Sequence, residues 1–81
     1  MKTIVFTASA AKQLDALPTQ VRAAVERALE RYAVDGRGDV KALQGRQGFR
    51  MRVGDYRVLF DETMTTILAV YVGRRQTTTY S

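Results

Sequence analysis

Residues 49–60 decide the fold of this chain, and they read FRMRVGDYRVLF. Polar and apolar side chains alternate on both sides of Gly54-Asp55, a dipeptide that favours a two-residue turn between antiparallel strands. With that turn, Arg52 lies directly opposite Arg57. The apolar members then share one face, which we expect to pack on the core: Phe49, Met51, Val53, Tyr56, Val58 and Phe60.

Arginines occupy the opposite face of this hairpin, at Arg50, Arg52 and Arg57. Like charges directly opposite each other destabilise a sheet, so stability alone does not explain the pairing of Arg52 with Arg57. A guanidinium can form two parallel hydrogen bonds to a phosphate or a carboxylate. We therefore interpret this face as a binding surface for an anion or for a partner's carboxylates. The alternative is the ordinary solvated surface of a basic protein.

Basic residues in neighbouring segments extend this surface. Lys41 and Arg46 precede the hairpin in an expected loop, and Arg74 and Arg75 follow the last expected strand. We expect all four beside the hairpin arginines. For Tyr80, the sequence leaves open whether the side chain packs in the core, is disordered or belongs to the site.

The remaining segments predict two helices and two more strands. We expect a strand at 3–7, a helix capped by Ser9 and ending near Leu17, a helix capped by Thr19 and running from Gln20 to about Val34, a loop at 35–39 and a strand at 66–72. Alternation in the last strand puts Tyr71 on the core side, facing Tyr56. The order β-α-α-β-β-β predicts one α+β domain over residues 1–81, with a helical hairpin packed on a mostly antiparallel four-stranded sheet.

The composition narrows the chemistry. The 81 residues include no His and no Cys, which excludes disulfides, Cys/His zinc sites, thiol nucleophiles and Ser-His-Asp hydrolysis. The acidic residues show no metal-ligand spacing, so we expect no metal and no other cofactor. The formal net charge is +5, and residues 41–81 hold seven of the 13 basic residues but three of the eight acidic ones. This imbalance favours a polyanionic or acidic partner.

Neither a membrane span nor a secretory signal is recognisable. No apolar run approaches the ~20 residues that a transmembrane helix needs, and the apolar stretch after Lys2 is too short for a signal peptide. We therefore expect a cytoplasmic protein without a membrane partner.

Three stretches carry a resemblance to a known family. They are KALQG at 41–45, the hairpin at 49–60, and VYVGRR at 70–75, which is followed by Tyr80. In these motifs and in its element order, the chain resembles the RelE/ParE superfamily of toxins from bacterial type II toxin–antitoxin modules. The resemblance implies the RelE-like microbial RNase fold. RelE-like members are ribosome-dependent mRNA endonucleases that cut the codon in the ribosomal A site, whereas ParE-like members inhibit DNA gyrase.

The resemblance also implies roles for individual residues. Arg50 and Arg52 match the family's basic pair on a strand, and Arg57 matches the hairpin arginine that binds phosphate. Arg75 matches the arginine at the scissile phosphate, and Tyr80 matches the C-terminal tyrosine that orients or activates the attacking 2′-hydroxyl. These five residues form the expected catalytic set. The residues expected to bind nucleic acid are Lys41, Arg46 and Arg74.

All five catalytic positions are matched, but the chain departs from the best-known RelE pattern in two respects. Arg50 and Arg52 replace lysines, and an arginine stabilises charge well but cannot act as an ordinary general base. The spacing from Arg75 to Tyr80 also differs by one residue. The complete set nevertheless favours the RelE-like branch.

The expected activity is therefore metal-independent cleavage of mRNA that inhibits translation. In the expected reaction, the 2′-hydroxyl attacks the adjacent phosphate and leaves a 2′,3′-cyclic phosphate. The implied partners are mRNA in the ribosomal A site and a small, acidic, DNA-binding antitoxin. Two alternatives stay open: a ParE-like DNA gyrase inhibitor without nuclease activity, and an inactive relative that only binds its antitoxin.

Overall fold

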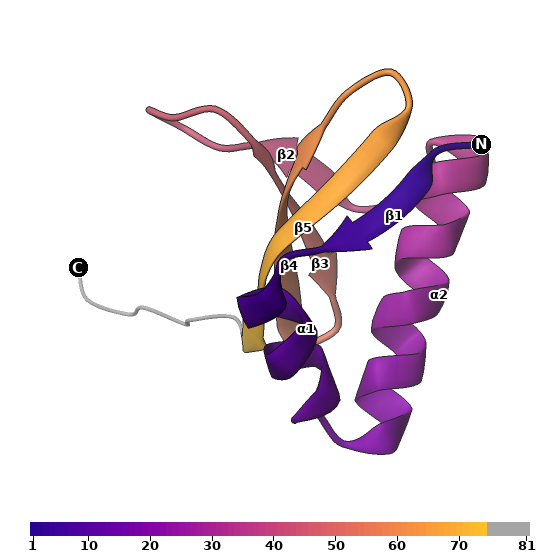
Figure 1. The fold of residues 1–81 in the computed structure, drawn as a ribbon, viewed down its shortest axis with the longest axis vertical. Helices are drawn as coiled ribbons and strands as arrows, with labels where there is room; N and C mark the ends of the chain where they lie inside the picture. Colours follow the sequence, from indigo (N-terminus) through magenta and orange to yellow (C-terminus); the bar gives the residue numbers. More distant parts are fainter. Residues whose placement is uncertain (75–81) are drawn as a thin grey trace.

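The computed structural model describes residues 1–74 as a sheet with two helices packed on one of its faces (Figure 1). Its elements are β1 (Thr3–Phe6), α1 (Ala8–Asp15), α2 (Thr19–Asp35), β2 (Val40–Ala42), β3 (Phe49–Val53), β4 (Tyr56–Glu62) and β5 (Thr66–Arg74). The strand order is β1-β5-β4-β3-β2, with β1 parallel to β5 and every other neighbouring pair antiparallel. The predicted α+β class is confirmed.

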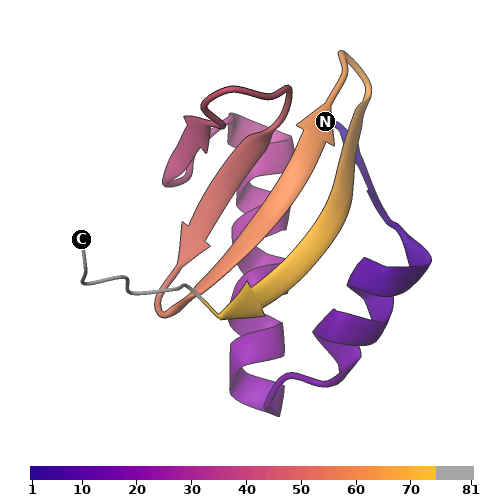
Figure 2. The same ribbon diagram turned by 90° about the vertical axis from the view of Figure 1, so that its left-hand side faces the viewer.

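The two faces of the sheet differ in what covers them. Figure 2 shows β3, β4 and β5 from the side opposite α2, and no helix lies over them there. The face toward the helices holds the core, in which α2 contributes Val25, Leu29 and Ala33. Within residues 1–74, no helix covers this second face, which we call the open face.

The β3–β4 hairpin forms in the predicted register, with Arg52 opposite Arg57. Gly54 makes its turn with φ +59°, a left-handed conformation that glycine adopts without the steric cost of a Cβ. The register sends alternate side chains into the core, where three of the predicted residues have at most 1% of their surface exposed: Met51, Val58 and Phe60. Burying an apolar side chain of this size contributes roughly 1.5–3 kcal/mol.

The sheet has one strand more than the predicted four. Residues Val40–Ala42, expected in a loop, form β2 and pair with β3. The Asp39 carbonyl continues this pairing by accepting a hydrogen bond from the Arg52 backbone N–H at 2.9 Å. A three-residue strand is too short to show an alternating pattern, so the sequence alone did not reveal it.

Both predicted helix caps were wrong. The N-cap of α1 is Thr7 rather than Ser9, because the Thr7 hydroxyl accepts a hydrogen bond from the Ala10 N–H at 3.1 Å. This helix also ends at Asp15, before the expected Leu17. At the start of α2, Thr19 is already helical, and Pro18 precedes it without a side-chain cap. Neither helix of the described part of the chain is long and apolar enough to cross a membrane.

A β-bulge changes the face on which Tyr71 lies. Leu59 pairs with Tyr71 but the next residue, Phe60, pairs with Ala69, so Val70 is left over in β5. The extra residue reverses the alternation of β5, and Tyr71 lies on the open face beside Arg57. The prediction that Tyr71 faces Tyr56 in the core was therefore wrong.

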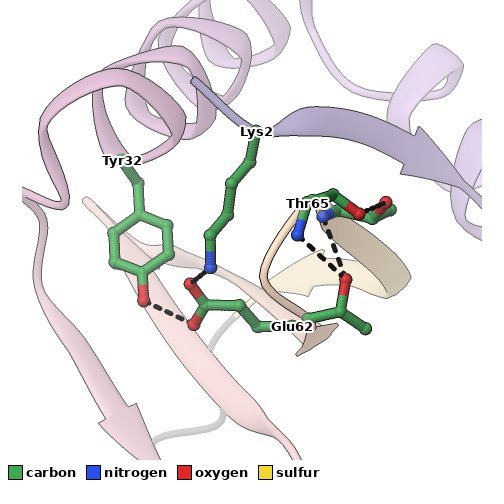
Figure 3. Close-up of polar contacts among 6 residues, drawn as sticks. Lys2, Tyr32, Glu62 and Thr65 are labelled. Atoms are coloured by element: carbon green, nitrogen blue, oxygen red, sulfur yellow. Dashed lines mark hydrogen bonds and ion pairs between the residues drawn. The ribbon is translucent and has the colours of Figure 1, made fainter.

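A polar cluster ties the start of the chain to the end of β4 (Figure 3). Glu62 accepts hydrogen bonds from the Lys2 ammonium and, at 2.8 Å, from the Tyr32 hydroxyl. The bond from Lys2 lowers the pKa of Glu62, against the opposing effect of burial. Burial, together with the bond to Glu62, raises the pKa of Tyr32 to about 12. The cluster therefore connects the segment before β1, helix α2 and the end of β4, which are distant in sequence.

Replacing Glu62 should remove one source of acid sensitivity. Because the pKa of Glu62 is lowered from its ordinary 4.5 in the folded protein, its stabilising effect is complete above pH 4.5 and is lost as pH falls through the lowered value. The stability difference between wild type and Glu62→Gln should therefore shrink in that acid range. Urea denaturation from pH 7 to pH 3 measures it. Glu26→Gln, at an exposed carboxylate of α2, is the control; parallel curves for wild type and Glu62→Gln would contradict the expectation.

Candidate nucleic-acid interface

Four cations lie on the open face of the sheet, and we call this surface the arginine face. It consists of Lys41 on β2, Arg50 and Arg52 on β3, and Arg57 on β4. Lys41 pairs with Arg50 just as Arg52 pairs with Arg57, so two like-charged pairs stand directly opposite each other across the strands. Each such pair opposes folding by some tenths of a kcal/mol.

No carboxylate of the described residues forms an ion pair with this face, although Asp61 lies on the same side of β4. The ion pairs among residues 1–74 are Lys2–Glu62 and Arg22–Asp15, and neither involves the arginine face. The side chains of Lys41, Arg50 and Arg52 are exposed. Their positive charge is therefore directed at solvent and attracts anions.

Arg57 differs from its neighbours because it is partly buried. Its Nε is covered and has no hydrogen-bond partner in the part of the chain that the structure describes. The guanidinium carbon lies 5.8 Å from the ring centroid of Tyr71. A buried donor without an acceptor costs free energy, so the fold tolerates a cost at Arg57.

A shallow hollow adjoins the arginine face at the β2 end. It is lined by Lys41, Ala42, Leu43, Gln44 and Arg50. The two cations at its rim belong to neighbouring strands, so Lys41 is held by the sheet rather than by the expected loop. A phosphate-sized anion could contact both.

The other predicted residues are not brought together in the same way. Arg46 is exposed in the loop between β2 and β3. Arg74 pairs with Tyr56 at the end of β5, which places it on the helix side rather than beside the arginine face, because strand residues alternate. Arg75 and Tyr80 lie outside the described residues.

The chemistry available on the arginine face is charge stabilisation. Several guanidinium groups can hold a phosphodiester and stabilise the negative charge that develops when it is attacked. The sequence has no histidine, whose ordinary pKa would suit proton transfer near neutral pH. Within residues 1–74, no three acidic side chains gather as metal ligands do.

Sequence reasoning missed Tyr71 as a member of this surface. Simple alternation assigns it to the core, and only the extra residue in β5 moves it to the open face. The one signal available in the sequence was Gly73, a residue that often marks a strand irregularity, and it lies three residues after the bulge at Val70.

No protein-family model matches the chain, and no curated protein sequence does either. Among solved structures, the toxin–antitoxin complex RelBE2 of Mycobacterium tuberculosis contains a chain 31% identical to this one. The match covers 91% of this chain and 98% of that chain, with a TM-score of 0.76. This chain belongs to the family of RelE-like toxins of type II toxin–antitoxin modules.

Two archaeal complexes share the fold of this RelE-like toxin at lower identity. The RelE–RelB complex of Pyrococcus horikoshii OT3 has a chain that is 20% identical, with a TM-score of 0.80 and coverage of 95% of this chain and 98% of that chain. The RelB–RelE complex of Methanococcus jannaschii has one that is 24% identical, with a TM-score of 0.74 and coverage of 88% and 89%. The resemblance expected from the sequence is confirmed at the level of family and fold.

Removing one cation from the arginine face should leave this RelE-like toxin as stable as before or slightly more stable. Arg52→Gln relieves the repulsion of Arg57, so we expect a gain of up to some tenths of a kcal/mol at low ionic strength, disappearing in ~1 M salt. Urea denaturation at both salt concentrations measures the gain. Arg37→Gln, in an exposed loop, removes the same charge elsewhere and controls for net charge. A loss of more than about 1 kcal/mol in Arg52→Gln would show that Arg52 is structural instead.

Proposed function

We propose that this protein is the toxin of a type II toxin–antitoxin module and acts as a ribosome-dependent mRNA endonuclease. The observation that carries the proposal is the arginine face, where cations stand opposite each other and form no ion pair within the described residues. The repulsion within such a surface lowers the stability of the fold, and binding a polyanion offsets this repulsion. Membership of the RelE-like toxins supports RNA as that polyanion.

The proposed reaction begins with the 2′-hydroxyl of the RNA, which attacks the adjacent phosphorus. The bond from phosphorus to the 5′-oxygen of the next nucleotide breaks, giving a 2′,3′-cyclic phosphate and a 5′-hydroxyl. Arg50, Arg52 and Arg57 hold the phosphate and stabilise the charge that develops on it. By resemblance, Arg75 serves the scissile phosphate and Tyr80 orients or activates the 2′-hydroxyl.

The ribosome is proposed as the second component of the active site. Arginines stay protonated, so the face supplies charge but little proton transfer. Holding the RNA with its 2′-hydroxyl aligned to the phosphorus then carries much of the acceleration. Efficient cleavage of naked mRNA by the purified protein would contradict the proposal that the ribosome aligns the RNA.

Primer extension on a reporter mRNA in a purified translation system tests the activity. Wild type should give cuts at A-site codons that disappear when ribosomes are omitted. Arg57→Ala should reduce the cleavage rate by about 10²-fold, the usual effect of removing one preorganised charge-stabilising donor. Arg75→Ala should reduce it comparably, and Arg37→Ala, at an exposed loop position, should not.

Absence of cuts by wild type would overturn the endonuclease proposal. A gyrase supercoiling assay would then test the ParE-like alternative, in which the arginine face is a docking surface and no bond is broken. Normal growth on induction would instead point to an inactive relative that only binds its antitoxin.

We also propose an acidic antitoxin partner for this chain. The complexes from Mycobacterium tuberculosis, Pyrococcus horikoshii and Methanococcus jannaschii, as named, pair such toxins with antitoxins. The uncompensated charge of the arginine face fits an acidic segment that folds on it. The alternative is that the segment displaces Tyr80.

Charge reversal separates these two modes of neutralisation. If the antitoxin covers the arginine face, the double variant Arg50→Glu/Arg52→Glu should bind it at least about tenfold more weakly, because each contact becomes repulsive. Titration calorimetry with the proposed acidic antitoxin measures the affinity, and Arg37→Glu is the control. Unchanged affinity in the double variant would exclude the arginine face as the antitoxin's binding surface.

A further inference from the structure

Tyr71 is the one tyrosine that the fold places on the arginine face within the described residues, and none of the predicted roles includes it. It is partly buried, and it does not belong to the hydrophobic core. The aromatic ring pairs of the described residues join Tyr32, Phe49 and Phe60, so Tyr71 takes no part in aromatic packing there. The ring of Tyr71 instead contacts the guanidinium group of Arg57.

Two features of β5 create this contact. Because of the bulge at Val70, Tyr71 lies on the open face and Val72 lies in the core. Only 2% of the surface of Val72 is exposed. The Gln13 side chain fixes the strand just beyond the bulge by accepting a hydrogen bond from the Val72 N–H at 2.8 Å. Without the bulge, alternation would direct the ring of Tyr71 toward the helices.

Gly73 provides the second feature, which is space for the ring. It pairs directly with Arg57 across the strands. A Cβ at Gly73 would overlap the phenol of Tyr71 at its hydroxyl oxygen and Cζ. The ring therefore lies along the strand over the bare glycine backbone, next to the guanidinium, and any larger residue at 73 would displace it.

The contact has the geometry of a cation–π interaction. The guanidinium carbon is 5.8 Å from the ring centroid, within the ~6 Å over which the face of an aromatic ring attracts a cation. The Nε of Arg57 is inaccessible to solvent and has no hydrogen-bond partner in the described chain. Neither terminal nitrogen is both buried and without a partner. The side chain thus has its Nε buried at the sheet and its guanidinium against the ring of Tyr71.

We propose that Tyr71 is a positioning residue, whose ring over Gly73 holds the Arg57 guanidinium in the orientation that binds the RNA phosphate. This inference deepens the proposed function, since it takes the phosphodiester of RNA as the anion. An arginine fixed before the ligand arrives loses less conformational freedom on binding than one on an exposed strand. Tyr71 would therefore strengthen phosphate binding without touching the phosphate itself.

Nitrogen NMR of the full-length chain tests the contact directly. The Nε–H signal of Arg57, identified by its loss in Arg57→Lys, should be shifted by the ring current of Tyr71. Tyr71→Phe keeps the ring and should keep this shift. Tyr71→Leu removes the ring, and Gly73→Ala displaces it, so both should lose the shift.

Binding is measured in the same spectra with a 2′-O-methyl RNA trinucleotide, which cannot undergo attack by its own 2′-hydroxyl. It should bind wild type and Tyr71→Phe alike and bind Tyr71→Leu and Gly73→Ala about fivefold more weakly, the effect of losing one cation–π contact. In an Arg57→Lys background, Tyr71→Leu should weaken trinucleotide binding much less than it does in the wild-type background. Leu68→Ala, on the same strand before the bulge, should change neither the signal nor the affinity, and thermal melting checks that each variant is folded.

Three results would overturn the proposal: undiminished trinucleotide binding by Tyr71→Leu, equal weakening by Tyr71→Phe, or an Arg57 signal in wild type that the trinucleotide does not move. Cleavage on ribosomes is scored separately with the same variants. If wild type fails to cleave but the NMR predictions hold, the endonuclease assignment falls and the role of Tyr71 in binding phosphate stands.

Discussion

The register of the β3–β4 hairpin fixes both the hydrophobic core and the charged surface of this protein. Gly54 closes the turn with φ +59°, and this turn fixes which side chains face α2 and which face solvent. A slip of one residue would exchange the two faces and bury the arginines without partners. Since an unpaired buried charge costs several kcal/mol, the core and the arginine face are set by the same choice of register.

The arginine face opposes stability and is tolerated because the core lies on the other side of the sheet. Two like-charged pairs lie across β2, β3 and β4, and their cations form no ion pair in the described part of the chain. The helices contribute to the core and leave this face open (Figure 2). One sheet thus separates the part of the protein that stabilises the fold from the part that we propose binds RNA.

The bulge in β5 links these two parts. By inserting Val70, it keeps both Ala69 and Val72 in the core and brings Tyr71 to Arg57. A regular strand could bury Ala69 or Val72 on the core face but not both, because its side chains alternate strictly. A local irregularity of the backbone therefore adds an aromatic side chain to a surface that the strand pattern alone would have left without one.

Local alternation about a recognisable turn was enough to predict the hairpin register, the core face of β3 and β4, and the cluster of Arg50, Arg52 and Arg57. The order of helical and strand patterns predicted the α+β class. Pairing between strands was needed to show that Val40–Ala42 is a strand, that Tyr71 joins the arginine face and that Arg74 does not. A three-residue strand exists only because β3 offers it hydrogen-bond partners, and a bulge exists only through the neighbouring strand's register. Such features depend on contacts between distant segments, and a local pattern carries no record of those contacts.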